Sequence, residues 1–193
     1  QLAKKFIKED LRPKIYFDRA GESYITARLE FHYGNNTINP FSSNLTVQDT
    51  PASDDHILIR DIHQERKVLS IFERADFIVS QGRISLDDDD KIFEFTVHWL
   101  PQLQELAEIF YSEDFKLKIR TTTSFSGRIR LDESLDMLEI SFQYSDIEPT
   151  ELTDIFNSLK LKKKYYRLRD GSFLDLNQPE MESIADLLDN LDI

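Results

Sequence analysis

The chain has 193 residues, of which 36 are acidic and 24 are basic, so its formal net charge is −12. It contains no cysteine, which excludes disulfides, thiol nucleophiles and cysteine-ligated zinc. No apolar run approaches the roughly 20 residues needed to span a bilayer, and the charged first residues are unlike a signal peptide. We therefore expect an intracellular folded protein. Because the chain begins with Gln1 rather than Met, we interpret it as a piece of a longer polypeptide.

The charge is distributed unevenly along the sequence. Residues 1–112 hold 13 basic and 19 acidic residues, and residues 113–169 hold 11 basic and 10 acidic ones. Residues 170–193 hold seven acidic residues and no lysine or arginine. The acidic balance argues against a protein dedicated to coating nucleic acid, although it leaves room for a local basic face.

Periodicity predicts the first elements in chain order. Residues 24–33 alternate between apolar and polar side chains, which indicates a half-buried strand. Residues 37–55 are polar and predict an extended loop. Over residues 61–74 the apolar side chains recur at helical spacing, so we expect a helix there.

A short hairpin and a long helical region are predicted next. Apolar residues 77–79 and residues 83–85 flank a glycine turn and indicate two short strands. The run from Asp87 to Asp90 is typical of a helix start, where acidic side chains cap the free N–H groups. Pro101 is expected to kink or restart this helix, and an apolar stripe predicts that the helix continues to Phe110.

Three alternating segments open the second half, at residues 115–119, 125–131 and 138–144. Their short polar links predict an antiparallel meander of three strands. A helix beginning near Pro149 follows, then a hairpin around Asp170 and a last amphipathic helix.

These elements predict an α+β fold with two antiparallel sheets, each packed by helices. We expect two subdomains, residues 1–112 and 113–193. Both follow the order strands, helix, hairpin, helix, so the chain is hypothesised to contain a pseudo-repeat.

Several kinds of catalytic site are excluded by the sequence. The five glycines lie too far apart to build a Walker loop or a dinucleotide-binding fingerprint, and no G-x-S-x-G elbow occurs. The four histidines lack metal-type spacing. Arg60, Asp61 and Glu65 resemble a catalytic cluster, but their spacing favours an ion pair or a helix cap. We therefore predict that the chain is not an enzyme.

Two groups of cationic residues are candidate binding residues. On the predicted meander, five cations share one outward face, namely Lys116, Lys118, Arg120, Arg128 and Arg130. A second cluster combines cations with an aromatic ring and consists of Lys160, Lys162, Lys163, Lys164, Tyr165, Arg167 and Arg169. Cations interleaved with aromatic rings are typical of phosphate-backbone binding with stacking. The alternative is a solvated outer face balanced by the acidic residues 170–193, and the overall charge favours this alternative.

Four blocks of the sequence resemble the helicase-associated domain of bacterial Swi/Snf-type ATPases. They are FHYGNN (31–36), RDIHQERKVLSIFERADF (60–77), HWLPQLQELAEIFYSEDF (98–115) and KKKYYRLRDGSFLDL (162–176). The last block is the most specific. In that family, the domain precedes a two-lobed, DNA-dependent ATPase motor, often with a zinc-binding SWIM segment further upstream. The resemblance assigns this domain no catalytic residues.

The resemblance implies a non-catalytic accessory or regulatory domain in the bacterial cytoplasm, acting at the nucleoid where its parent does. Its partners would be the ATPase motor lobes of the same polypeptide and double-stranded DNA, and no membrane is expected. No cofactor is expected in this chain, because ATP and Mg²⁺ would be bound by the parent motor. The alternative function is a protein–protein interaction module without nucleic-acid binding.

Overall fold

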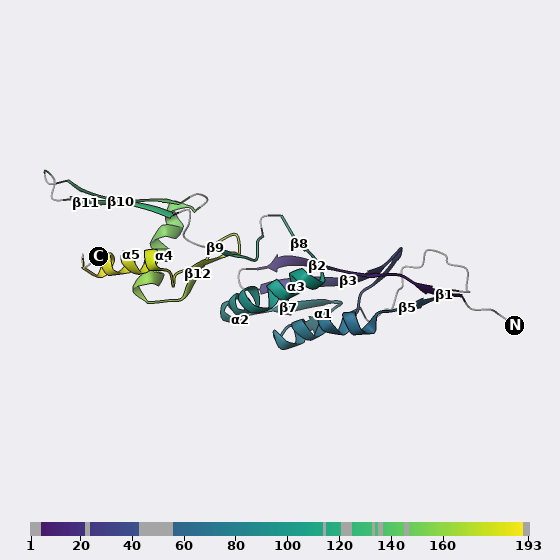
Figure 1. Ribbon diagram of the computed structural model, residues 1–193. Coiled ribbons are helices and arrows are strands. Elements are labelled where there is room, and N and C mark those ends of the chain that lie inside the picture. The colour runs from purple at the N-terminus through teal and green to yellow at the C-terminus, as the bar shows by residue number, and fades with distance from the viewer. Residues whose placement is uncertain are drawn as a thin grey trace. The chain divides into compact units, whose positions relative to one another are not determined.

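The computed structural model describes residues 5–21, 24–42, 56–113, 115–120, 125–132, 134, 137–144 and 147–190. The chain divides into two compact units, Gln1–Leu117 (unit 1) and Lys118–Ile193 (unit 2) (Figure 1). This division falls after Leu117, whereas the sequence predicted a boundary after residue 112. Much of the predicted loop at 37–55 lies outside the described residues.

Unit 1 is built on a mixed six-stranded sheet with the strand order β6-β7-β3-β2-β8, and β4 pairs with β3. Its strands are β2 Leu11–Ala20, β3 Tyr24–Tyr33, β4 Asn36–Ile38, β6 Ile78–Ser80, β7 Arg83–Leu86 and β8 Glu108–Tyr111. Neighbouring strands are antiparallel except for β2 and β8, which are parallel. Pro13 fits within β2 because the pairing with β8 begins only at Lys14, so no ladder hydrogen bond to that strand is lost.

Helices pack on one face of this sheet, and their bounds are α1 Ile62–Arg74, α2 Asp89–Glu94, the π-helical segment η1 Phe95–Trp99 and α3 Leu100–Leu106. Alternate residues of β2 and β3, such as Ile15, Phe17 and Leu29, are fully buried. The ring of Phe95 lies 4.9 Å from that of Phe77 and 5.8 Å from that of Phe17. The core of unit 1 therefore lies between the sheet and this helical layer, as period-two alternation requires.

The helical region from α2 to α3 contains one extra residue. Phe95 and Leu100 are both buried although five positions separate them, a spacing that an α-helix would place on different faces. The π turn returns Leu100 to the buried face, with its N–H donating to the carbonyl of Phe95. Pro101 follows directly and has no N–H to donate, which favours an irregular turn here. The predicted helix to Phe110 is wrong, because α3 ends at Leu106 and residues 108–111 form β8.

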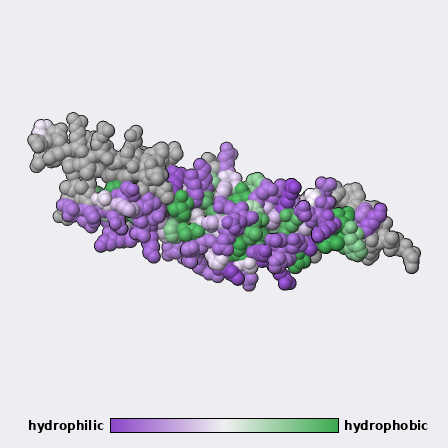
Figure 2. Space-filling view, viewed as in Figure 1, coloured by the Kyte–Doolittle hydropathy of each residue, from purple (hydrophilic) through white to green (hydrophobic). Residues whose placement is uncertain are grey.

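A second, two-stranded sheet in unit 1 pairs β1 Lys5–Lys8 with β5 His56–Ile59 in parallel. Phe6, Ile57 and Ile59 on this ribbon are exposed, and Figure 2 shows the resulting apolar surface near the N-terminus. A two-stranded ribbon is marginal by itself. We attribute its order to its anchorage at β2 and α1, into which its strands lead.

Unit 2 contains a three-stranded sheet, a hairpin and two helices. Its elements are β9 Ile119–Arg120, β10 Phe125–Asp132, β11 Met137–Tyr144, α4 Pro149–Lys160, β12 Tyr165–Arg167, β13 Phe173–Asp175 and α5 Pro179–Asn190. The strand order is β12-β13-β9, with β13 antiparallel to β12 and parallel to β9. Ile155, Leu159, Leu174 and Met181 form the core between the helices and this sheet.

The α+β class is confirmed, but the predicted arrangement of the sheets is corrected. Both larger sheets are mixed rather than antiparallel, because β8 and β9 each join as parallel strands. The three-stranded meander is wrong: β10 and β11 pair with each other, while β9 pairs with β13. Alternation in a sequence indicates which side chains are buried, but it does not specify the neighbouring strand. The pseudo-repeat stays a hypothesis. In unit 1 the hairpin strand β7 pairs with β3 in antiparallel orientation, whereas in unit 2 the hairpin strand β13 pairs with β9 in parallel.

Candidate partner-binding site

The five cations of the predicted positive face do not share one sheet. Lys116 and Lys118 are exposed but lie outside the described strands. Arg120 is on β9, whereas Arg128 and Arg130 are on β10 of the separate hairpin. The sequence prediction of a single positive sheet face is therefore wrong.

Arg120 holds the Asp-Gly turn of the hairpin together. Its Nε donates to Ser172 Oγ at 3.0 Å, and its guanidinium forms an ion pair with Asp170. Asp170 also accepts the backbone N–H of Ser172 at 2.9 Å. Burial alone would raise the pKa of Asp170, but the hydrogen bonds from Ser172 and the charge of Arg120 outweigh it and leave that pKa below its usual value. We conclude that Arg120 stabilises a turn.

The aromatic and arginine members of the second cluster also contact their own unit. Tyr165 packs edge-on against Phe173, with ring centroids 5.2 Å apart, and Arg167 lies 5.6 Å over the same ring. The backbone N–H of Arg169 donates to the buried carboxylate of Glu151 at 2.8 Å. These contacts build the hairpin onto α4 and explain the conformation of residues 165–169 without a ligand.

The lysines of the cluster are exposed at the end of α4. They are Lys160, Lys162, Lys163 and Lys164. Within the described part of the chain, none of the four forms an ion pair at 4.0 Å or closer. Cations are favoured at this position, because the carbonyl end of a helix carries partial negative charge.

Three of these lysines, Lys162, Lys163 and Lys164, form one wall of a groove whose volume is about 320 Å³. The opposite wall is α5, which contributes Glu182, Asp186 and Asp189, spaced so that all three share one face of the helix. The floor is apolar and is formed mainly by Leu159, Leu176, Met181 and Ala185. Sequence reasoning missed the acidic wall, although the helical spacing of the three carboxylates was visible.

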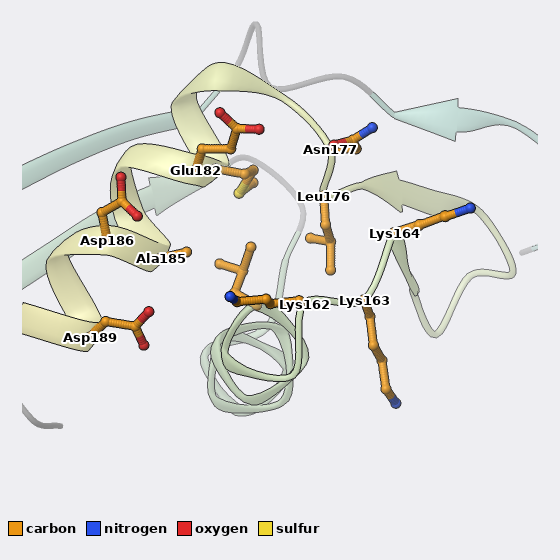
Figure 3. A pocket seen from close by; sticks show the side chains of 11 residues that line it. Lys162, Lys163, Lys164, Leu176, Asn177, Glu182, Ala185, Asp186 and Asp189 are labelled. Atoms are coloured by element: carbon orange, nitrogen blue, oxygen red, sulfur yellow. The ribbon is translucent and has the colours of Figure 1, made fainter.

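The two walls carry opposite charge and remain unpaired with each other. Figure 3 shows Lys162 pointing toward α5 and Asp189 pointing toward Lys162, while Lys163 and Lys164 point away from α5. Among the described residues, no carboxylate of the acidic wall forms an ion pair within 4.0 Å. The groove thus offers an apolar floor between cations and anions that are accessible to a partner.

The polar cluster of unit 1 is structural. Asp61 caps α1 by accepting the N–H of Gln64 at 3.1 Å, and Arg60 forms a bidentate pair with buried Glu65. The hydroxyl of Tyr33 donates to Glu65 at 2.5 Å. The pKa of Tyr33 is raised, mainly because the ring is buried and secondly because of this hydrogen bond to Glu65. The predicted ion pair and cap are confirmed. Asp88 likewise caps α2, as the acidic run predicted.

Two other features, a metal-binding cluster and a membrane-spanning helix, are absent from the described residues. In that part of the chain, no cluster of three or more histidine and acidic side chains is arranged to hold a metal ion. None of the described helices combines the length and the apolar character that crossing a membrane requires.

The comparisons identify the family of the chain. A family model described as "Bacterial SNF2 helicase associated" matches residues 1–193, so the whole chain belongs to that family. The resemblance inferred from the sequence blocks is thereby confirmed. No curated protein and no solved structure matches the chain.

Proposed function

We propose that this chain is a non-catalytic accessory domain that docks on the ATPase motor lobes of its parent SNF2 helicase. The groove between α4 and α5 is the docking site, and the mixed charge of its walls carries the proposal. ATP and Mg²⁺ are bound by the motor, and the chain itself uses no cofactor. A bacterial cytoplasmic location follows from the same context.

The electrostatics favour a protein partner over duplex DNA at this groove. A phosphate backbone brought against Lys162 would also approach the carboxylates of Asp186 and Asp189. Unit 2 as a whole has 10 basic and 15 acidic residues, a net charge of −5, and unit 1 has 14 and 21, a net charge of −7. A protein segment can satisfy both walls at once, because it can present an acidic and a basic side chain around an apolar anchor.

The test is the affinity of this chain for purified motor lobes of the SNF2 helicase. Ala185→Arg places a long cation in the floor of the groove, and we expect it to weaken binding by about tenfold or more. Ser183→Arg is the matched control, because residue 183 is exposed on α5 and does not line the groove. We expect it to change the affinity less than about twofold. Equal effects of the two variants, with both folded by circular dichroism, would contradict docking at this groove.

Duplex DNA is a second candidate partner, favoured by the four exposed lysines at the end of α4. If these lysines meet phosphates, the logarithm of affinity should fall with the logarithm of salt concentration by about 0.9 per neutralised phosphate. Reversing the charges of Lys162, Lys163 and Lys164 should then flatten this slope. Binding that is absent or insensitive to salt would remove DNA as a partner of the chain.

A further inference from the structure

We propose that unit 1 contains a second peptide-docking groove, of the same design as the groove of unit 2, at the C-terminal end of α1. A cavity of about 210 Å³ lies between this end of α1 and the helical segment that follows the hairpin. It is lined chiefly by Arg74, Asp76, Lys91, Glu94 and Trp99. None of these residues was singled out for binding by the sequence.

The wall on α1 is shaped by a Schellman motif, in which two N–H groups beyond the helix bond back to its last turn. Asp76 donates to the carbonyl of Glu73 at 3.2 Å, and Phe77 donates to that of Phe72 at 3.1 Å. Asp76 has a left-handed backbone with φ of 63°. The rings of Phe77 and Phe72 are in contact, as is usual in this motif.

The groove of unit 2 has the same local construction. Lys162 donates to Leu159 at 2.9 Å, Lys163 donates to Ser158 at 3.1 Å, and Lys162 has φ of 53°. In both units the motif leads into a short hairpin and then into the helix that forms the opposite wall. The two cavities therefore occupy equivalent places in two helix–hairpin–helix segments.

Each groove has a cation on its first wall and an anion on its second, and the unit 1 groove also carries the reverse pair, Asp76 and Lys91. In unit 1 the cation Arg74 is on the first helix and the anion Glu94 is on the second, while Asp76 and Lys91 pair with each other at 3.6 Å. In unit 2 the lysines follow the first helix and the carboxylates line the second. One kind of segment suits both, with an apolar anchor between an acidic and a basic side chain.

Trp99 supplies the apolar contact surface in unit 1. It is the one tryptophan of the chain, is half-buried, and ends the π-helical segment beside the buried Phe95. Tryptophan contributes large contact area at little entropic cost and is enriched among the residues that dominate binding energy. The occupant of this groove is therefore a peptide segment of a partner protein, with its apolar side chain placed against Trp99.

Trp99 is also the reporter for the test, because it is the one tryptophan of the chain, so tryptophan emission excited selectively over the seven tyrosines comes from this groove. The probes are short synthetic peptides with a central leucine, flanked by one glutamate and one lysine, by two glutamates, or by two lysines. We expect a saturable change of Trp99 emission with the mixed peptide, and affinities about fivefold or more weaker for the other two.

Charge variants should then exchange these preferences. Glu94→Arg makes the rim basic and should select the peptide with two glutamates, whereas Arg74→Glu should select the peptide with two lysines. Glu73→Arg is the control, since this exposed residue lies beside the cavity without lining it. The inference is overturned if no peptide gives a saturable change, or if Glu73→Arg exchanges the preferences equally.

The outcome is separable from the docking proposed for unit 2. Ala185→Arg lies in the other groove and should leave the Trp99 response unchanged. If that variant retains both motor binding and the Trp99 response, the unit 2 proposal fails while the unit 1 groove stands. If motor binding is lost in Ala185→Arg but Trp99 never responds to a peptide, the unit 1 groove fails while the unit 2 proposal stands.

Discussion

At the scale of single residues, the turn after α4 places a lysine where glycine is usual. Lys162 has φ of 53°, a left-handed conformation that costs a residue with a Cβ atom about 1 kcal/mol. Its ammonium group points toward the acidic wall on α5 (Figure 3). The backbone strain at Lys162 therefore lowers the stability of the folded chain, while the attraction between its ammonium group and the carboxylates of α5 raises it.

Lys162→Gly should raise the free energy of unfolding by about 0.5–1 kcal/mol, because glycine adopts this backbone without strain. The measurement is the midpoint of urea unfolding, compared between variants whose dependence of unfolding free energy on urea concentration (the m-value) is the same. Lys163→Gly is the control, since residue 163 does not have a positive φ and the added chain entropy should only destabilise. A destabilised Lys162→Gly would show that the charge of Lys162 outweighs its strain.

The turn at Asp170 should make unit 2 sensitive to acid. Its pKa is lower in the folded state than in the unfolded chain, so its contribution to stability is complete above the unfolded value of about 4. That contribution is lost as the pH falls through the lower folded pKa. Asp170→Asn should therefore flatten the decline of unfolding free energy below about pH 4. An unchanged slope would show that the Arg120 and Ser172 contacts do not stabilise the carboxylate.

At the scale of elements, the π turn accounts for the five-residue spacing between Phe95 and Leu100. Deleting exposed His98 shortens this spacing to four, which an ordinary α-helix places on one face. We expect the deletion to cost no more than about 1 kcal/mol and to retain cooperative unfolding.

The matched control is a deletion in a regular helix. Removing Ser70 from α1 rotates Ile71 and Phe72 by about 100° relative to Val68, so unit 1 should lose its cooperative transition. Circular dichroism during urea unfolding distinguishes the two deletions. If both were tolerated equally, the π turn would not be the element that sets the buried register.

The sequence predicted most elements whose register depends on local signals. The strand at 24–33, the helices at 61–74 and near Pro149, and the hairpin at Asp170 are all observed. Each is specified by alternation, by helical spacing or by a turn residue within the element. Strand β2 was missed, because Pro13 and interleaved charges obscure its alternation.

What could not be predicted depends on partners that are distant in the sequence. Residues 108–111 continue an apolar helical stripe, yet they pair with β2 because the sheet of unit 1 can accept a parallel edge strand. The binding residues show the same limit. Arg120 was assigned to an open face, but its partner Asp170 is fifty residues away. The acidic wall of the groove lies on α5, whose carboxylates indicate in the sequence only an acidic C-terminal segment.

At the scale of the whole molecule, each of the two units has its own core. Phe95 is fully buried among Phe17, Phe72 and Phe77 in unit 1, so Phe95→Ala should destabilise that unit by about 3–5 kcal/mol. Amide hydrogen exchange should then accelerate in β2 and β3 and remain unchanged in β13 and α5. Faster exchange in both units would show that they unfold as one.

The parallel pairing of β2 with β8 has a consequence for synthesis on the ribosome. Lys14 pairs with Glu108, so the edge of the six-stranded sheet cannot close until nearly all of unit 1 has left the exit tunnel. The helices α1 to α3 form from local contacts before that moment, whereas this edge must wait for its distant strand. Nascent unit 1 therefore exposes the unpaired edge of β2 late in translation, and unpaired strand edges are prone to aggregation.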